Sequence, residues 1–527
     1  MVKDYDLDAV TRRMLFGHED ATQEDQKRLS DYFIRRGDFE TVHSSLPFCI
    51  VVGRKGTGKS AILRYSNWCD LHTDSSEKRL SIWLRPDDIT EMYSEIDTQL
   101  SINEIALFWK KGIARCVASQ IINECDFQTD DERSKVIQWA YEKGYGSRDF
   151  LSAIAHKLSG IIKTPLGEVN IEKITDSVDK NIGEHHVLQR ILKTKLYFYM
   201  DDLDRGWIPE RNNAKKLKAL ILALGDMTSV IENFKARIAL RTDVYDYLNT
   251  DEEFFDKFET AVVWCRWTNA DILKVLIKRI ASFFEIQISD SDLKSMSQRD
   301  LAEHFFPPLI ETYFKDTKVW QGKTTHRVLM SLVRGIPRDI VKLLNSAAKR
   351  AYENNRKTIE PQDICDILDE YSRLRLKDIS REFHSELQCV QNLLLNMGPT
   401  QEEKRKKKEK RYLYTTAELK IKIEQAVAHI GRVHFSWSNA PAQFMDIAHF
   451  LYKIGFITAR CDYPSKIERT CYDVSPFLLT RQCGDKGYSW EIHPAYRAAL
   501  YTYDPTDILW QNTIEISDSD EEYVVEK

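Results

Sequence analysis

The stretch that decides the fold covers residues 48–64 and reads FCIVVGRKGTGKSAILR. Its first five residues are apolar, a length and composition typical of a buried strand. The next eight, residues 53–60, match the pattern G-x-x-x-x-G-K-[ST] at every position. The remaining residues open a helix. A buried strand, a glycine-rich turn and a helix in this order predict a phosphate-binding loop.

Each residue type in this turn has a physical role in holding a polyphosphate. Glycines let the backbone turn so that successive N–H groups point at phosphate oxygens, and the helix adds the positive end of its dipole. Lys59 supplies a positive charge for the β and γ phosphates, and the Ser60 hydroxyl is a ligand for Mg²⁺. We therefore predict that the loop binds ATP with Mg²⁺. The predicted nucleotide-binding residues are Gly53, Arg54, Lys55, Gly56, Thr57, Gly58, Lys59, Ser60 and Ala61.

A second motif places acids at the end of an apolar strand. Residues 195–200 read KLYFYM, and DDLDR follows at 201–205. Such a strand delivers carboxylates to the carboxyl edge of a sheet, where ligands bind in open α/β folds. Asp201 is predicted to hold Mg²⁺, and Asp202 to orient or deprotonate the attacking water. An acidic helix cap after the strand is the alternative, and Asp204 with Arg205 could form a surface ion pair.

Two arginines are candidates for stabilising transition-state charge. Arg241 follows the apolar strand 237–240, and Arg338 opens a helix whose first turn contains Pro337. Either arginine could reach a γ-phosphate. The alternative is that both are ordinary surface residues.

Short apolar segments alternate with helical ones along the first half of the chain. The predicted strands are 48–52, 80–84, 195–200, 237–240 and 261–265. Alternation of this kind predicts an α/β fold with a mostly parallel sheet and helices on both faces. The predicted divisions are an N-terminal helical segment 1–45, a core 46–267 with a helical insertion at about 100–190, a helical domain 268–399, a basic linker 400–412, a compact unit 413–505 and an acidic tail 506–527.

The order of these motifs resembles that of AAA+ and STAND NTPases. The GRKGTGKSA loop is similar to that of a group of bacterial P-loop ATPases, and DDLDR is similar to the Walker B motif of KAP NTPases. The segment FG…A…D…L…YF at 16–33 and the ending IHPAYRAAL at 492–500 also resemble the bacterial group. The remaining marks are ALRTDVY at 239–245 and GIPRD at 335–339. The resemblance covers residues 14–385 well and the C-terminal unit more weakly.

This resemblance implies roles for several residues. It makes Arg241 a sensor 1 residue, Arg338 a sensor 2 residue of a helical lid at 268–399, and the unit 413–505 a winged helix. Members of these families are nucleotide switches, often oligomeric, and many bacterial relatives occur in antiviral defence loci. Most AAA+ members have Glu where Asp202 stands, so the shorter carboxylate predicts slow or partner-dependent turnover. Arg205 is the candidate for an arginine finger.

Composition limits the remaining possibilities. The formal net charge of −5 excludes a polycation, so a nucleic-acid contact must be local. The run from Lys404 to Arg411 could supply it, or could be a solvated linker. The N-terminus has no signal-peptide pattern, and no stretch approaches the roughly 20 apolar residues of a spanning helix. The ten cysteines form no CxxC pair. These features predict a cytoplasmic protein that does not enter a membrane.

Three functions follow from these patterns. The first is an ATP-driven switch, in a homo-oligomer or a complex with an effector protein, with a role in antiviral defence implied by the resemblance. The second is a loader-type ATPase that binds DNA or RNA through residues 404–411 and the C-terminal unit, as in origin-recognition ATPases. The third is a module that holds ATP with little turnover.

Overall fold

The computed structural model describes residues 16–72, 79–84, 99–110, 113, 195–203, 207–231, 233–249, 256–307, 309–315, 320–400, 402–403, 412–438, 440–463, 467–480 and 484–500. Most of the predicted insertion, the basic run 404–411 and the acidic tail lie outside these residues. The chain divides into two compact units. We call residues 36–55 and 59–265 the sheet unit, and residues 1–35, 56–58 and 266–527 the helical unit.

The sheet unit is built on a five-stranded sheet in the order β2-β3-β4-β1-β5. Every neighbouring pair is parallel, which confirms the predicted α/β class. The fourth strand begins three residues before the predicted start, because Phe234, Lys235 and Ala236 pair with β3. The strands are β1 (Phe48–Gly53), β2 (Arg79–Leu84), β3 (Lys195–Met200), β4 (Phe234–Arg241) and β5 (Val262–Trp264).

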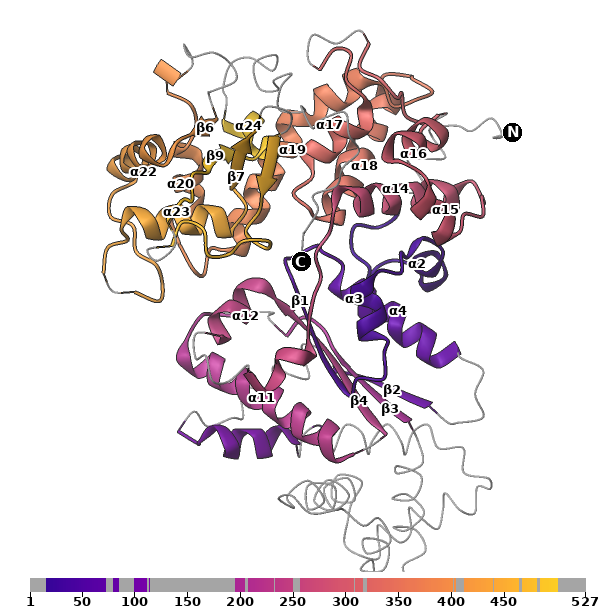
Figure 1. Cartoon of the computed structure of the whole chain (residues 1–527), viewed down its shortest axis with the longest axis vertical. Coiled ribbons are helices and arrows are strands. Elements are labelled where there is room, and N and C mark those ends of the chain that lie inside the picture. The colour runs from indigo at the N-terminus through magenta and orange to yellow at the C-terminus, as the bar shows by residue number, and fades with distance from the viewer. Residues whose placement is uncertain are drawn as a thin grey trace, which may run out of the picture. The chain divides into compact units, whose positions relative to one another are not determined.

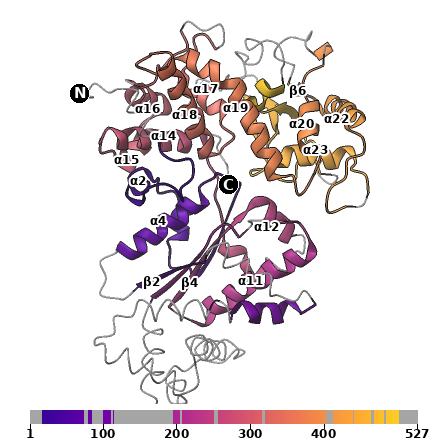
Figure 2. The same cartoon turned by 180° about the vertical axis from the view of Figure 1, so that it is seen from behind.

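Helices cover both faces of this sheet, as Figures 1 and 2 show from opposite sides. All six residues of β1 are buried, as expected for a strand covered on both faces. Residues 102–110 are also helical, and Trp109 within them is fully buried in the same core. The other helices of the unit are α3 (Gly37–Val42), α4 (Lys59–His72), α11 (Arg211–Val230), α12 (Thr242–Leu248) and the short 3₁₀ helix η1 (Asp256–Ala261).

The first part of the helical unit forms one core from helices and the N-terminal segment. Phe16 is fully buried in it, together with residues of α14 and α18. Pro337 is the first residue of α18, where a missing N–H costs nothing. The helices are α2 (Gln26–Tyr32), α14 (Asn269–Phe283), α15 (Asp290–Ser295), α16 (Gln298–Phe305), α17 (Thr325–Leu332), α18 (Pro337–Glu353) and α19 (Pro361–Glu382).

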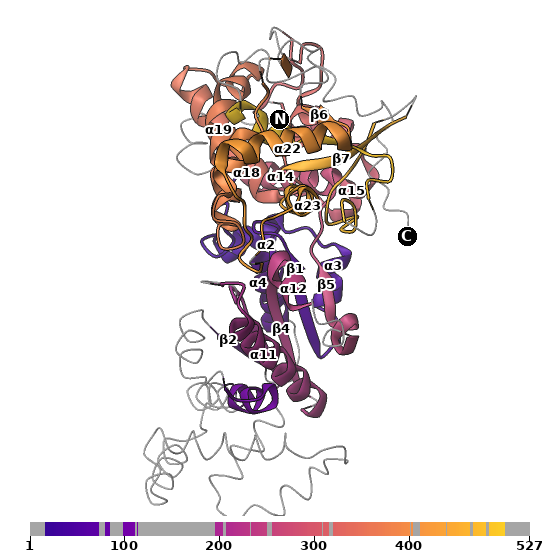
Figure 3. The same cartoon turned by 90° about the vertical axis from the view of Figure 1, so that its left-hand side faces the viewer.

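The second part of the helical unit combines helices with a small antiparallel sheet, seen in Figure 3. The sheet order is β6-β9-β7-β8, and β7 and β8 pair antiparallel. Its core also takes in the end of α19. The elements are α20 (Val390–Asn396), β6 (Leu413–Tyr414), α22 (Thr416–Ile430), α23 (Phe444–Lys453), β7 (Ile457–Asp462), β8 (Ile467–Thr470), β9 (Ser489–Ile492), α24 (Pro494–Arg497) and the 3₁₀ helix η3 (Ala498–Leu500).

Within the residues that the structure describes, no helix combines the length and apolar character needed to cross a bilayer.

Candidate nucleotide site

The predicted phosphate loop lies at the junction of β1 and α4. The strand ends at Gly53 and the helix begins at Lys59, so the turn between them has the predicted strand–turn–helix context. Gly56 has a φ of +87° and Gly58 a φ of +91°. Only glycine adopts this left-handed region without steric cost, which explains both glycines of the motif.

The tip of the loop, residues 56–58, groups with the helical unit. A Cβ added at Gly56 would lie 2.9 Å from Ile336 Cγ2 and 3.1 Å from Arg338 Cβ. The Trp267 indole N–H donates to the Thr57 carbonyl at 2.6 Å. A side chain larger than hydrogen therefore has no room at position 56, besides being strained there.

Lys59 keeps its amine against the loop. Its Nζ donates to the Gly53 carbonyl at 2.9 Å and to the Arg54 carbonyl at 3.2 Å. These carbonyls are weaker partners for an ammonium group than phosphate oxygens, because neutral acceptors form weaker hydrogen bonds than charged ones. The amine is thus already beside the loop that would hold the triphosphate.

Ser60 and Asp201 come together although they are far apart in the chain. The Ser60 side chain hydrogen-bonds the Asp201 carboxylate, which also accepts the Asp202 backbone N–H at 3.0 Å. Burial raises the pKa of Asp201, and the charge of Asp202 adds to the increase, while the hydrogen bonds oppose it. A carboxylate whose negative charge is poorly compensated, next to a hydroxyl oxygen, suits a hard cation such as Mg²⁺.

Asp202 combines exposure with a strained backbone. Its φ is +53°, a value uncommon outside glycine although aspartate tolerates it better than most residues. Its side chain is exposed to solvent at the carboxyl end of β3. Residues held in such conformations cost roughly 1–3 kcal/mol and are concentrated at functional sites. Asp204 and Arg205 lie outside the described residues.

The sheet order brings Arg241 next to the phosphate loop. Strand β4 lies between β1 and β3, and Arg241 is paired in register with Gly53. Its Nε donates to Asp243 Oδ1 at 2.9 Å, and its Nη2 contacts the other oxygen of the same carboxylate. Sequence reasoning missed Asp243. The two-residue spacing in RTD is the signal that could have found it.

Arg338, the second residue of α18, has different neighbours. Its Nε donates to the Glu19 carbonyl at 3.1 Å, and its Nη2 lies 3.8 Å from Asp20 Oδ2. Lys342, one turn further on, lies 2.8 Å from Glu19 Oε2. Sequence reasoning noted residues 16–20 as a family mark but assigned them no role. The structure thus places Lys59, Ser60, Asp201, Asp202 and Arg241 in the sheet unit, and Arg338 in the helical unit.

Comparison with known proteins gives partial matches. The family model described as FunZ-associated C-terminal helical domain matches residues 271–380, a range that begins within α14 and ends within α19. The transposon gamma-delta 80.3 kDa protein of Escherichia coli (strain K12) is 23% identical over 408 residues, which are 73% of this chain. The chain spans 54% of that relative, about half its length.

Two solved structures are distantly similar to this chain. The ORC2 protein of Aeropyrum pernix, described as ADPNP–ADP complexes, is 11% identical with a TM-score of 0.37, and covers 91% of this chain and 94% of its own. Cdc6p of Pyrobaculum aerophilum is 13% identical with a TM-score of 0.29, and the match covers 93% of this chain and 97% of the Cdc6p chain. Likeness at this level carries no argument about activity. The parallel sheet and the loop between β1 and α4 make the fold that of a P-loop protein.

Proposed function

We propose that this protein binds ATP with Mg²⁺, hydrolyses it, and acts as a nucleotide-driven switch. The observation that carries the proposal is the hydrogen bond between Ser60 and Asp201. It joins the last residue of the phosphate loop to the first acid after β3. In a P-loop site the metal is held by these two residue types.

The other residues of the sheet unit have roles that follow from their positions. The Lys59 amine would leave the loop carbonyls for the β and γ phosphates. Bound Mg²⁺ would neutralise phosphate charge, with Ser60 and Asp201 as its protein ligands. Asp202 would orient the attacking water and accept its proton, and Arg241 would stabilise charge on the γ-phosphate. The short Asp202 side chain favours slow turnover.

The decisive experiment measures nucleotide binding and phosphate release by purified full-length protein. We expect Mg²⁺-dependent ATP binding that Lys59→Ala weakens by about tenfold or more, since one charge-assisted contact contributes about 1.5–3 kcal/mol. Lys349→Ala is the matched control, because Lys349 is highly exposed on α18. Binding and turnover that survive unchanged in Lys59→Ala would remove the assigned site.

Coupling to the helical unit is the second part of the proposal. Arg338 lies on the first turn of α18, and its Cβ lies beside Gly56 at the tip of the loop. We propose that a γ-phosphate draws the Arg338 guanidinium from Glu19 and Asp20, so that ATP and ADP stabilise different states. Loss of discrimination between ATP and ADP in Arg338→Ala tests this step. Equal discrimination in both proteins counts against it.

A nucleic-acid-binding ATPase is the alternative function. The aromatic residues near the basic run, Tyr412, Tyr414 and Trp437, could either stack bases or pack in the core, and both tyrosines are buried. Trp437 is 53% exposed and stacks on Phe435 with centroids 4.9 Å apart, so it can offer a ring face to a base. Binding to single-stranded DNA that falls steeply between low and high salt supports this function. Salt-independent binding, or none, contradicts it.

The biological setting stays a prediction. A homo-oligomer or an effector complex is expected for a switch ATPase, and size-exclusion chromatography with and without ATP measures it. The defence role rests on the resemblance of the motifs to those of bacterial families. A cytoplasmic location is likewise a prediction.

A further inference from the structure

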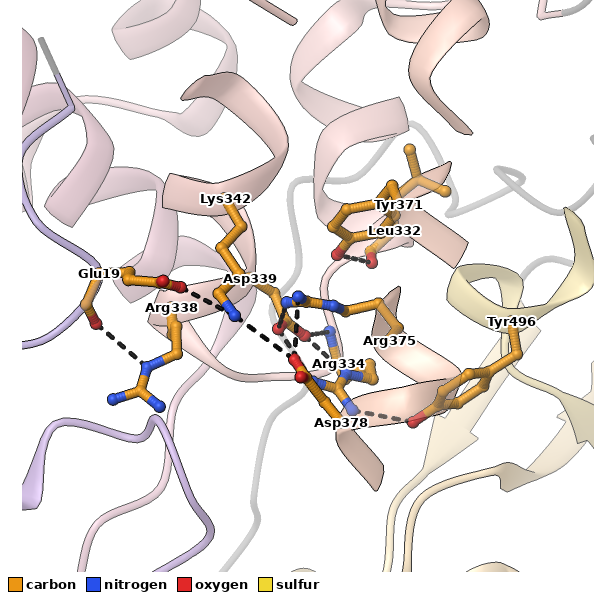
Figure 4. Close-up of polar contacts among 10 residues, drawn as sticks. All are labelled: Glu19, Leu332, Arg334, Arg338, Asp339, Lys342, Tyr371, Arg375, Asp378 and Tyr496. Atoms are coloured by element: carbon orange, nitrogen blue, oxygen red, sulfur yellow. Dashed lines mark hydrogen bonds and ion pairs between the residues drawn. The ribbon is translucent and has the colours of Figure 1, made fainter. Parts of the chain in front are cut away.

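A cluster of buried charges surrounds Asp339, the residue after Arg338 on α18 (Figure 4). Asp339 Oδ2 accepts from Arg334 Nε at 2.7 Å, and Oδ1 accepts from Arg334 Nη2 at 2.9 Å and from Arg375 Nη1 at 2.7 Å. The side chains of Asp339 and Arg375 are each 1% exposed. Burial favours the neutral acid, but the two arginines outweigh it and hold the pKa of Asp339 well below its usual range.

Such a cluster is a weak source of stability. Buried ion pairs can often be replaced by apolar residues at no cost, whereas removal of one partner is strongly destabilising. What the cluster does provide is geometry. Arg375 ties the first turn of α18 to α19, and Arg334 ties it to the segment before Gly335.

One end of the cluster reaches the surface through Lys342. Its Nζ lies 2.8 Å from Glu19 Oε2 and 3.4 Å from Asp378 Oδ2, and that same Asp378 oxygen lies 3.0 Å from Arg375 Nη2. The Glu19 carbonyl also accepts from Arg338. Glu19 therefore engages both cations on this face of α18, and Lys342 connects that face to the buried arginine.

The other end of the cluster reaches α24. Arg334 Nη1 donates to the Tyr496 hydroxyl at 3.0 Å, and the ring of Tyr496 is fully buried. The Ala499 N–H donates to the Ser372 hydroxyl on α19 at 2.9 Å. Burial, and then the charge of Arg334, lower the pKa of His493 to about 3, so this histidine adds no charge near neutral pH. Residues 493–500, which directly follow β9, are thus docked on α19.

The contacts form a continuous series in which each carboxylate is shared. Asp378 is shared by Lys342 and Arg375, and Asp339 by Arg375 and Arg334. When one cation moves, the carboxylate that it leaves becomes more available to the next, because hydrogen-bonded groups polarise one another in a low dielectric. Displacing Glu19 from Lys342 is therefore expected to alter the Arg334–Tyr496 contact without direct contact between the two ends.

We infer that this cluster couples the Arg338–Lys342 face of α18 to the docking of residues 493–500. The inference rests on the proposed function only for the identity of the trigger, a γ-phosphate at Arg338. Coupling between two sites is reciprocal, so a change at Tyr496 also changes the affinity for the trigger.

The first experiment needs no nucleotide. Hydrogen exchange is measured in the full-length protein and in Lys342→Met, with Lys349→Met as the control on the same helix. Lys342 is partly exposed and Lys349 highly exposed, so both variants are expected to fold, which far-UV circular dichroism checks. We expect exchange across residues 493–500 to become about threefold faster or more in Lys342→Met, and to stay the same in Lys349→Met.

Tyr496→Phe calibrates this measurement, because it removes only the hydroxyl that accepts from Arg334. It is expected to speed exchange over the same residues. Tyr452→Phe is its control, since the Tyr452 hydroxyl has no hydrogen-bond partner among the described residues. Unchanged exchange over 493–500 in Lys342→Met, or in Tyr496→Phe, overturns the coupling.

The second experiment adds a non-hydrolysable ATP analogue or ADP. The analogue, but not ADP, is expected to change exchange over residues 493–500, and Tyr496→Phe is expected to abolish that change. Bound analogue with unchanged exchange overturns the coupling to nucleotide. If no nucleotide binds at all, the proposed function fails, while the nucleotide-free comparison of Lys342→Met with Lys349→Met still decides the coupling.

Discussion

Two carboxylates of this protein lie in opposite electrostatic surroundings. Asp201 in the sheet unit has a hydroxyl and a backbone N–H as partners, and burial raises its pKa. Asp339 in the helical unit has two arginines, and its pKa is lowered. The negative charge of Asp201 is poorly compensated by the protein, and a bound cation would compensate it. The negative charge of Asp339 is already compensated by Arg334 and Arg375. An uncompensated charge marks a binding site better than burial or charge alone.

The comparison is tested most severely by removing each carboxylate. Asp339→Ala leaves two buried arginines without their anion, so we expect a loss of about 3–5 kcal/mol in the free energy of unfolding. Asp201→Asn removes a poorly compensated charge and is expected to leave that free energy unchanged or higher. Urea unfolding of both variants measures the difference. Equal destabilisation by the two substitutions would show that Asp201 is a structural residue as well.

ATP turnover is expected to depend on the sheet unit rather than on the helical unit. Asp202→Asn keeps the size of the side chain but removes the base, and we expect a loss of about 100-fold in ATP turnover with little change in ATP affinity. Asp369→Asn, in the helical unit, is the control, because Asp369 is exposed on α19 and lies outside the Asp339 cluster, and it should retain turnover within a few-fold. Phosphate release under saturating ATP measures both. Normal turnover in Asp202→Asn takes this residue out of the reaction.

The shape of the loop is tested by a smaller change. Gly58→Ala forces alanine to a φ of +91°, which costs about 1–2 kcal/mol and is expected to weaken ATP binding by about tenfold. Gly37→Ala is a matched control, because a Cβ at Gly37 meets nothing within 4 Å. That variant should bind ATP normally. Titration with a fluorescent ATP analogue measures both affinities, and equal values would mean that the loop does not need this conformation.

The smallest expected effect is on the pH dependence of stability. The pKa of Asp201 is raised on folding, so its contribution is most favourable below its ordinary value of 3.8 and is lost as the pH rises through the folded value. Asp339 behaves in the opposite way, because its lowered pKa stabilises the fold above 3.8 and that stability is lost as the pH falls. Asp201→Asn should therefore gain stability relative to the wild type between pH 4 and 7. If the difference in the free energy of unfolding between Asp201→Asn and the wild type stays constant over that range, the pKa of Asp201 is not raised on folding.

Much of the sheet unit could be predicted because its signals are local. The phosphate loop is eight consecutive residues, and Asp201 follows an apolar strand directly. The pairing of Arg241 with Gly53 could not be predicted without the strand order, because β1 and β4 are neighbours in the sheet but far apart in the sequence. Sequence pattern alone places Arg241 at a strand end but not beside the loop.

The Asp339 cluster could not be predicted for the same reason. Its members come from the segment before α18, from α18 itself, from α19 and from α24, and no spacing in the sequence links Arg375 to Tyr496. The GIPRD motif at 335–339 led to a predicted role for Arg338 but to none for Asp339. The burial of Tyr412 and Tyr414 depends on a non-local contact too, because β6 pairs with β9 and both side chains lie in the core of that sheet and its helices.

The contact between Arg279 and the Phe16 carbonyl joins residues 263 positions apart. On the ribosome, at about 5–20 residues per second, α14 follows residues 16–35 by tens of seconds. During that interval Phe16 lacks the α14 residues of its core, whereas the strands of the sheet unit are all synthesised before α14. The N-terminal segment is therefore the first part of the described chain to be made, and the burial of Phe16 has to wait until α14 has been synthesised.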